Sequence, residues 1–96
     1  MPKVLLYISA KITWIFLFFG TDVNENRAHV HVGKKSTDKY GKIWLEPNVS
    51  VAKGGTLTME ELNEALKITV QYRTQLMDQW SKFTNGKTIK MITIKQ

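Results

Sequence analysis

Short stretches dominated by β-branched and aromatic residues recur along the chain, several of them with alternating polar and apolar positions. Such residues favour β-strands, and alternation puts successive side chains on opposite faces of a strand. The pattern predicts strands over residues 3–9, 12–19, 28–33, 42–46, 49–52 and 88–94. The second stretch is apolar on both faces, which indicates a central or covered strand. A turn is expected between it and the third, over residues 20–26.

A different spacing begins at Thr58. Thr58 and Glu61 match a capping box, in which each side chain satisfies a backbone amide near the other residue. Beyond this point apolar residues recur every three or four positions, and Asn85-Gly86 supplies a stop signal. The pattern therefore predicts one helix from Thr58 to about Thr84, whose apolar stripe covers the sheet.

Together these elements predict a single α+β domain over residues 1–96, with a mostly antiparallel sheet packed on one long helix in the C-terminal half and a final short strand. A chain of 96 residues, 43% of them hydrophobic, suits one small core. It contains no cysteine, which excludes disulfides and thiolate metal sites and favours a cytoplasmic location.

The charge balance narrows the classes of partner. Fourteen Lys and Arg against eight Asp and Glu give a formal net charge of +6, which favours nucleic acid, an acidic protein or an anionic surface as the partner.

The apolar segment 4–19 is interrupted by Lys11, so its uncharged runs are shorter than the roughly 20 residues of a spanning helix. No small-residue cleavage site follows it. We therefore expect no membrane association.

The two histidines of the chain, His29 and His31, lie at alternate positions of one predicted strand, just before Lys34 and Lys35. Period-two spacing puts both imidazoles on one face, where we expect them to project together into solvent. Imidazoles that titrate near neutrality beside fixed positive charge suit an anionic ligand, a metal ion or proton transfer. The spacing alone does not choose among the three.

One metal ion could take both imidazoles, but a firm zinc site needs a third or fourth ligand. The acidic residues nearby in sequence are Asp22, Glu25, Asp38 and Glu46. These four are the only nearby candidates for the further ligands, and we expect no metal and no other cofactor.

Two further uses of the histidine strand are open. RNA cleavage needs no metal where one imidazole acts as base and another as acid, which makes His29 and His31 candidate catalytic residues. Two side chains from one strand, however, tend to lie on the same side of a phosphate. Binding without chemistry needs only a positive rim and an aromatic platform. The candidate ligand-binding residues are Arg27, Lys34, Lys35, Lys42, Trp44 and, as the one charge in the helix stripe, Arg73, with Lys39 and Tyr40 nearby.

Several segments taken together match one known family. They are Phe18-Phe19, Asn24 to Val32, Lys42 to Pro47, Glu60 to Asn63, and Trp80. Over roughly residues 15–86 the chain resembles the bacterial family named domain of unknown function 4160. Members usually carry a proline shortly before the first histidine, where this chain has Arg27-Ala28.

The resemblance implies a function by association. Members are often encoded beside a protein of domain of unknown function 2442, and that pairing looks like a toxin–antitoxin module. It implies a component that acts through a basic, histidine-bearing surface on RNA or on a cognate antitoxin-type protein. The alternative is a non-catalytic protein-interaction module with structural histidines. The sequence leaves open whether the protein is an enzyme; if it is, we expect a ribonuclease-like activity. It does not indicate an oligomeric state.

Overall fold

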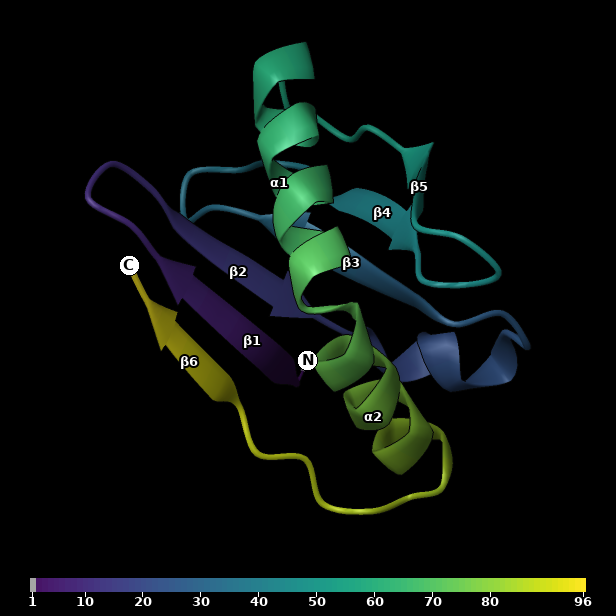
Figure 1. Cartoon of the computed structure of the whole chain (residues 1–96). Helices are drawn as coiled ribbons and strands as arrows, with labels where there is room; N and C mark the ends of the chain where they lie inside the picture. The colour runs from purple at the N-terminus through teal and green to yellow at the C-terminus, as the bar shows by residue number, and fades with distance from the viewer. Residues whose placement is uncertain (1) are drawn as a thin grey trace.

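The computed structural model describes residues 2–96 and contains one six-stranded sheet with two α-helices (Figure 1). The strands are β1 (Lys3–Ile8), β2 (Thr13–Leu17), β3 (His29–Gly33), β4 (Gly41–Trp44), β5 (Ser50–Lys53) and β6 (Ile92–Lys95). Their order across the sheet is β5-β4-β3-β2-β1-β6, and only the β1–β6 pair is parallel. The expected α+β class and the mostly antiparallel sheet are confirmed.

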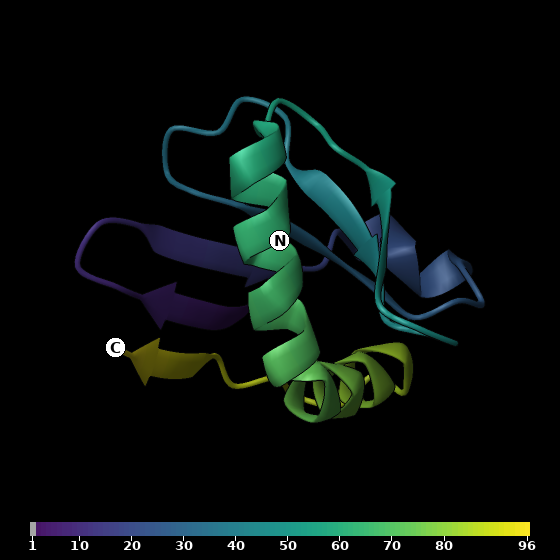
Figure 2. The same ribbon diagram turned by 45° about the horizontal axis from the view of Figure 1, so that its top comes forward.

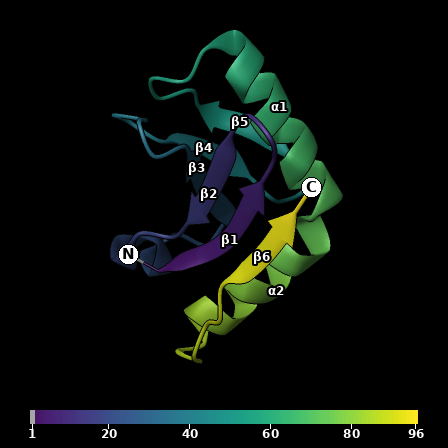
Figure 3. The same ribbon diagram turned by 90° about the vertical axis from the view of Figure 1, so that its left-hand side faces the viewer.

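Both α-helices pack mainly on the same face of this sheet, which leaves most of the other face without an α-helix (Figure 3). Alternate residues of the central strands fill the space beneath the helices. Trp14 and Phe16 of β2 and Val30 and Val32 of β3 have no solvent exposure and belong to the cluster that includes Leu76. Burial of large apolar side chains, at roughly 1.5–3 kcal/mol each, makes this layer the main source of stability. The opposite surface is called the helix-free face below.

The single long helix predicted from Thr58 to Thr84 is corrected by the structure to two. Helix α1 (Met59–Gln71) ends and α2 (Arg73–Thr84) begins at Tyr72, whose φ and ψ of −109° and 22° are not helical (Figure 2). A straight helix over residues 59–84 would be roughly 39 Å long. The longest dimension of the molecule is 34 Å. The break changes the direction of the chain, so that α2 follows the sheet, and Trp80 packs against Phe18 with ring centroids 5.4 Å apart.

The C-terminal strand is shorter than the predicted 88–94 and begins at Ile92. It lies along the outer edge of β1, and α2 runs close by (Figure 3). Gln79, which is buried, donates hydrogen bonds from its Nε2 to the carbonyls of Val4 and Lys90 at 3.1 and 2.7 Å. The amide thus ties α2 to β1 and to the segment that leads into β6.

Candidate functional site

The two histidines occupy alternate positions of β3 on the helix-free face, as predicted. His31 is paired with Leu17 of β2 and Lys42 of β4, and His29 is paired with Trp44. The expectation that both rings project into solvent is wrong. His29 has no exposed surface, and the side chain of His31 is only 12% exposed.

The covering segment explains this burial. In place of a simple turn, Gly20–Asn24 forms a 3₁₀ helix, η1, which follows directly after β2. The ring of Phe19, just before it, lies 4.3 Å from that of His31. The rings of Trp80 and Trp44 lie 4.9 and 5.6 Å from that of His29. Residues from a loop, a helix and a neighbouring strand therefore enclose the imidazoles.

Asp22 of η1 joins the two histidines in one cluster. Its Oδ1 lies 3.1 Å from Nε2 of His29, and its Oδ2 lies 3.1 Å from Nε2 of His31. One ligand atom from each of the three residues falls within 4.8 Å of the others. Asp22 is itself 5% exposed, and its Oδ2 accepts a hydrogen bond from the Phe19 amide at 2.7 Å. Asp22, His29 and His31 are called the histidine–aspartate centre below.

Of the two ring nitrogens of His29, only Nδ1 has a clear hydrogen-bond partner among the residues that the structure describes. Nδ1 lies 2.9 Å from the carbonyl oxygen of Arg27, and a carbonyl only accepts, so Nδ1 carries a proton. Nε2 is buried and makes no well-aligned hydrogen bond to any described residue, although Asp22 is close. If the ring is neutral, Nε2 presents a lone pair to the centre.

The electrostatics of the other two members support a neutral imidazole beside a charged carboxylate. Burial would raise the pKa of Asp22, but the Phe19 amide and the two histidines together outweigh it, so the net pKa is lowered. Burial lowers the pKa of His31 by more than the Asp22 carboxylate raises it. At neutral pH the centre therefore contains an ionised carboxylate and an uncharged His31.

Three of the predicted ligand-binding residues gather beside this centre. Arg27 and Lys42 lie over the ring of Trp44, with their charged groups 4.1 and 4.6 Å from its centroid. Lys42 Nζ also lies 3.0 Å from both carboxylate oxygens of Glu25, and the Arg27 Nε donates to the carbonyl of Glu46 at 2.8 Å. These cations are already engaged with aromatic, carboxylate or carbonyl groups, so they form a structural border to the centre.

The remaining predicted residues lie elsewhere. Lys34 forms an ion pair with Glu61 at the start of α1 and lowers the pKa of that carboxyl group. Arg73 donates from Nε to the carbonyl of Leu45 at 2.7 Å, which joins α2 to the chain after β4. Lys35 lines a pocket over β2. No finding tests the functional roles of these residues, which stay predictions.

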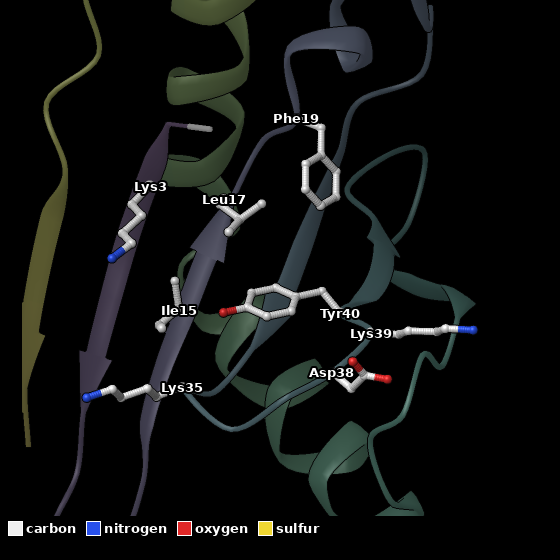
Figure 4. Close-up of a pocket in the computed structure, with 8 residues that line it drawn as sticks. All are labelled: Lys3, Ile15, Leu17, Phe19, Lys35, Asp38, Lys39 and Tyr40. Carbon is white, nitrogen blue, oxygen red and sulfur yellow. The ribbon is translucent and has the colours of Figure 1, made fainter.

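The helix-free face also contains a pocket that was not expected from the sequence. It has a volume of about 610 Å³ and lies over β2 and the loop between β3 and β4 (Figure 4). Its lining combines apolar or aromatic side chains with charged ones: Ile15, Leu17, Phe19, Tyr40, Lys3, Lys35, Lys39 and Asp38. Phe19 belongs both to this pocket and to the surroundings of His31, so the pocket and the centre adjoin.

Tyr40 owes its place in the pocket to Gly33. A Cβ atom on Gly33 would come within 2.8 Å of two ring carbons of Tyr40, so only glycine lets the ring lie flat on β3. Burial raises the pKa of the Tyr40 hydroxyl. The signals in the sequence were the apolar residues on both faces of β2 and the tyrosine in an otherwise polar loop.

Comparisons with known proteins agree with the resemblance noted from the sequence. Among the described residues, no helix combines the length and the apolar character needed to cross a membrane. No curated protein and no solved structure matches the chain. A family model described as Domain of unknown function (DUF4160) matches residues 13–81, which include β2 to β5, the histidine–aspartate centre, all of α1 and most of α2. Because this match covers well over half of the 96 residues, the chain belongs to the DUF4160 family.

Proposed function

We propose that the protein binds single-stranded RNA on the helix-free face of its sheet. The observation that carries this proposal is the pocket over β2, in which aromatic and apolar side chains lie between lysines (Figure 4). Proteins that bind single strands combine the same two elements, aromatic side chains on which bases stack and positive charge that follows the backbone.

The lysines at the pocket are free to meet phosphates. Lys3, Lys35 and Lys39 are exposed, and none of them takes part in an ion pair with the residues that the structure describes. They differ in this from Lys34 and Lys42, whose ammonium groups are paired with Glu61 and Glu25. The net charge of +6 supports binding to a polyanion.

The pocket also has groups suited to a base. The rings of Tyr40 and Phe19 lie near Leu17 and present flat, partly exposed surface (Figure 4). Asp38 on the rim is an acceptor for the exocyclic amino groups of bases. A base reaches such a pocket only when it is unstacked, which favours a single strand over a duplex.

Binding is favoured over cleavage by the state of the two histidines. An acid and a base for RNA cleavage must both reach the phosphate ester. His29 is fully buried, and both rings face the same carboxylate of Asp22. The predicted catalytic roles of His29 and His31 are therefore tested as a second readout of the binding experiment.

The test uses a fluorescent single-stranded RNA of mixed sequence, measured by anisotropy over a series of salt concentrations. Contacts with three phosphates predict that log K falls with log salt at a slope of roughly −2. Duplex RNA of the same length is the comparison and is expected to bind more weakly. The same samples, incubated with a chelator and run on a denaturing gel, report cleavage. An affinity that salt leaves unchanged, or equal affinity for the duplex, would overturn the proposal.

Variants locate the surface. Tyr40→Ala is expected to weaken binding about 5-fold to 150-fold, from the usual 1–3 kcal/mol of a stacked base. The double variant Lys35→Met/Lys39→Met removes two charges from the pocket. Its control, Lys67→Met/Lys90→Met, removes two exposed charges outside it. Equal losses in the two double variants would show that net charge alone is responsible.

The toxin–antitoxin role implied by the family resemblance belongs to the same proposal. An acidic antitoxin-type protein would be attracted to the same free lysines as RNA. If such a partner is encoded beside this protein, it is expected to compete with the labelled RNA for wild-type protein. Partner binding that survives Lys35→Met/Lys39→Met would place its docking surface elsewhere and make the protein an interaction module.

A further inference from the structure

The histidine–aspartate centre contains three side chains of the kinds that bind metal ions in proteins. We propose that Asp22, His29 and His31 bind one divalent transition-metal ion. Their candidate ligand atoms lie within 4.8 Å of one another, and each Nε2 is 3.1 Å from a carboxylate oxygen. Two ligand atoms on one tetrahedral zinc ion, at about 2.0–2.1 Å each, lie roughly 3.4 Å apart. Small side-chain rotations are enough to close the set around an ion.

The buried Nε2 of His29 points independently to a cation. Because Nδ1 donates its proton to the Arg27 carbonyl, a neutral His29 has only a lone pair at Nε2. This atom is buried and has no hydrogen-bond donor among the described residues, and its nearest polar neighbour is the Asp22 carboxylate. Two acceptors face each other at a buried position, an arrangement that costs free energy unless positive charge lies between them.

A proton on Nε2 is the rival source of that charge. It would make His29 an imidazolium paired with Asp22, while a neutral His31 with its proton on Nε2 would donate to Oδ1 of Asp22 at 3.3 Å. Nε2 of His31 converges on the same carboxylate. One divalent ion would accept electron pairs from both imidazoles and from the carboxylate at once. It also avoids placing a cationic ring at a position with no solvent exposure.

Hydrogen bonds from neighbouring backbone groups hold the candidate ligands, as they do in known metal sites. A histidine that binds a metal through one nitrogen commonly donates its other N–H to a carbonyl or carboxylate, as His29 does to Arg27. The Phe19 amide holds Oδ2 of Asp22 in the same way. These two bonds orient the ligands before an ion arrives.

The donor set limits the class of ion. Two imidazole nitrogens and one carboxylate oxygen, without sulfur, suit zinc, iron(II) and manganese rather than copper(I). Three protein ligands leave at least one coordination position open, which is the pattern of sites that bind water or a substrate rather than of closed structural sites. The proposal reverses the expectation from the sequence that no metal is bound, because Asp22 supplies the third ligand from a segment whose fold the sequence pattern did not reveal.

The first experiment measures metal binding by tag-free, chelator-treated protein. Zn²⁺ is titrated calorimetrically, and Co²⁺ is titrated by its visible absorption, whose intensity reports the coordination geometry. We expect one ion per chain with micromolar or tighter affinity, and a melting temperature that rises with Zn²⁺ concentration. Failure of Zn²⁺, Co²⁺ and Mn²⁺ to bind would overturn the proposal.

Variants assign the ligands. Asp22→Asn and His31→Gln keep side-chain size and are each expected to weaken Zn²⁺ binding at least about tenfold. Asp38→Asn is the control, because that carboxylate lies on the pocket rim and outside the ligand cluster. Circular dichroism checks that each variant is folded. If Asp22→Asn and His31→Gln bind Zn²⁺ as wild type does, the ion lies elsewhere and the assignment is wrong.

Histidine ¹⁵N NMR separates the ion from its rival. Zn²⁺ is expected to shift the Nε2 resonances of His29 and His31 and to leave the Nδ1–H of His29 in place. If both nitrogens of His29 carry protons at neutral pH and Zn²⁺ leaves them there, the proton is the true occupant. RNA binding by Asp22→Asn at wild-type strength would show that the two proposals are independent.

Discussion

The two faces of β2 and β3 are covered by different means. On one face, two helices bury alternate residues such as Phe16 and Val32 by apolar packing alone. His29, on the helix-free face, is buried just as completely, but by the short η1 segment, by the ring of Trp44 in β4 and by the ring of Trp80, which extends to it from α2. That cover depends on a few polar bonds, among them the one from the Phe19 amide to Asp22. A cover of this kind opens at lower free energy than a packed core, which suits the proposed entry of a ligand.

The largest expected effect tests this contrast along one strand. Phe16→Ala empties a fully buried position under the helices and is expected to lower the free energy of unfolding by about 3–5 kcal/mol. Ile15→Ala changes the next residue, which is half-buried on the opposite face, and should cost clearly less. Urea denaturation measures both. Equal losses would mean that the two faces contribute alike to stability.

A smaller effect separates stability from binding. Thr58 Oγ1 accepts the Glu61 amide at 3.1 Å, and Glu61 Oε1 accepts the Thr58 amide at 2.8 Å. Thr58→Ala should lower stability by about 1 kcal/mol through loss of this cap. RNA affinity should stay at the wild-type value, since the cap lies outside the pocket. Thr58→Ser, which keeps the hydroxyl, is the control and should retain most of the stability.

The third prediction acts on the helix-free face with little change in stability. Gly33→Ala places a methyl group against the ring of Tyr40 and should tilt that ring away from β3. We expect RNA affinity to fall severalfold, by less than in Tyr40→Ala. Gly20→Ala is the matched control, because an added Cβ there meets no atom within 4 Å. Fluorescence anisotropy measures both. An unchanged affinity in Gly33→Ala would remove Tyr40 from the binding surface.

The smallest expected effect concerns the ion pair between Lys34, directly after β3, and Glu61 of α1. The Lys34 ammonium lowers the pKa of Glu61, so this pair stabilises the folded state above the ordinary glutamate pKa, and the stabilisation is lost as pH falls through the lowered value. In Lys34→Met the pKa of Glu61 should rise towards its ordinary value. Carboxyl-carbon NMR across an acid titration measures it. Lys35→Met should leave the Glu61 pKa unchanged, and a shift there would show that the effect is not specific to the pair.

The strands could be predicted because the alternation of polar and apolar residues within each strand shows which side chains share a face. His29 and His31 had to share a face, since the side-chain period of a strand is two. Their burial could not be predicted in the same way. It depends on η1, whose Asp22 turns back to the Phe19 amide, and a lone aspartate in a polar segment carries no signal of that bond.

The helix break shows a second limit. Neither glycine nor proline marks Tyr72, and the apolar spacing continues across it, so a local pattern cannot reveal the change of direction. Tertiary contacts decide it. Tyr72 packs against Tyr7 of β1 with ring centroids 6.1 Å apart. These two rings meet only when β1 and the end of α1 are brought together in the folded protein, so the contact cannot be read from the residues around Tyr72.

The residues that the family model matches leave out two strands of the sheet. Both β1 and β6 lie outside residues 13–81, although β1 forms backbone hydrogen bonds along the whole length of β2. A polypeptide trimmed to residues 13–81 would lack both strands, so the backbone N–H and C=O groups of β2 that bond to β1 would be unpaired. Unprotected edges recruit strands from other molecules. Such a trimmed polypeptide should therefore self-associate more readily than residues 1–96, in which β1 covers the edge of β2 and only the four-residue strand β6 lies at this edge of the sheet.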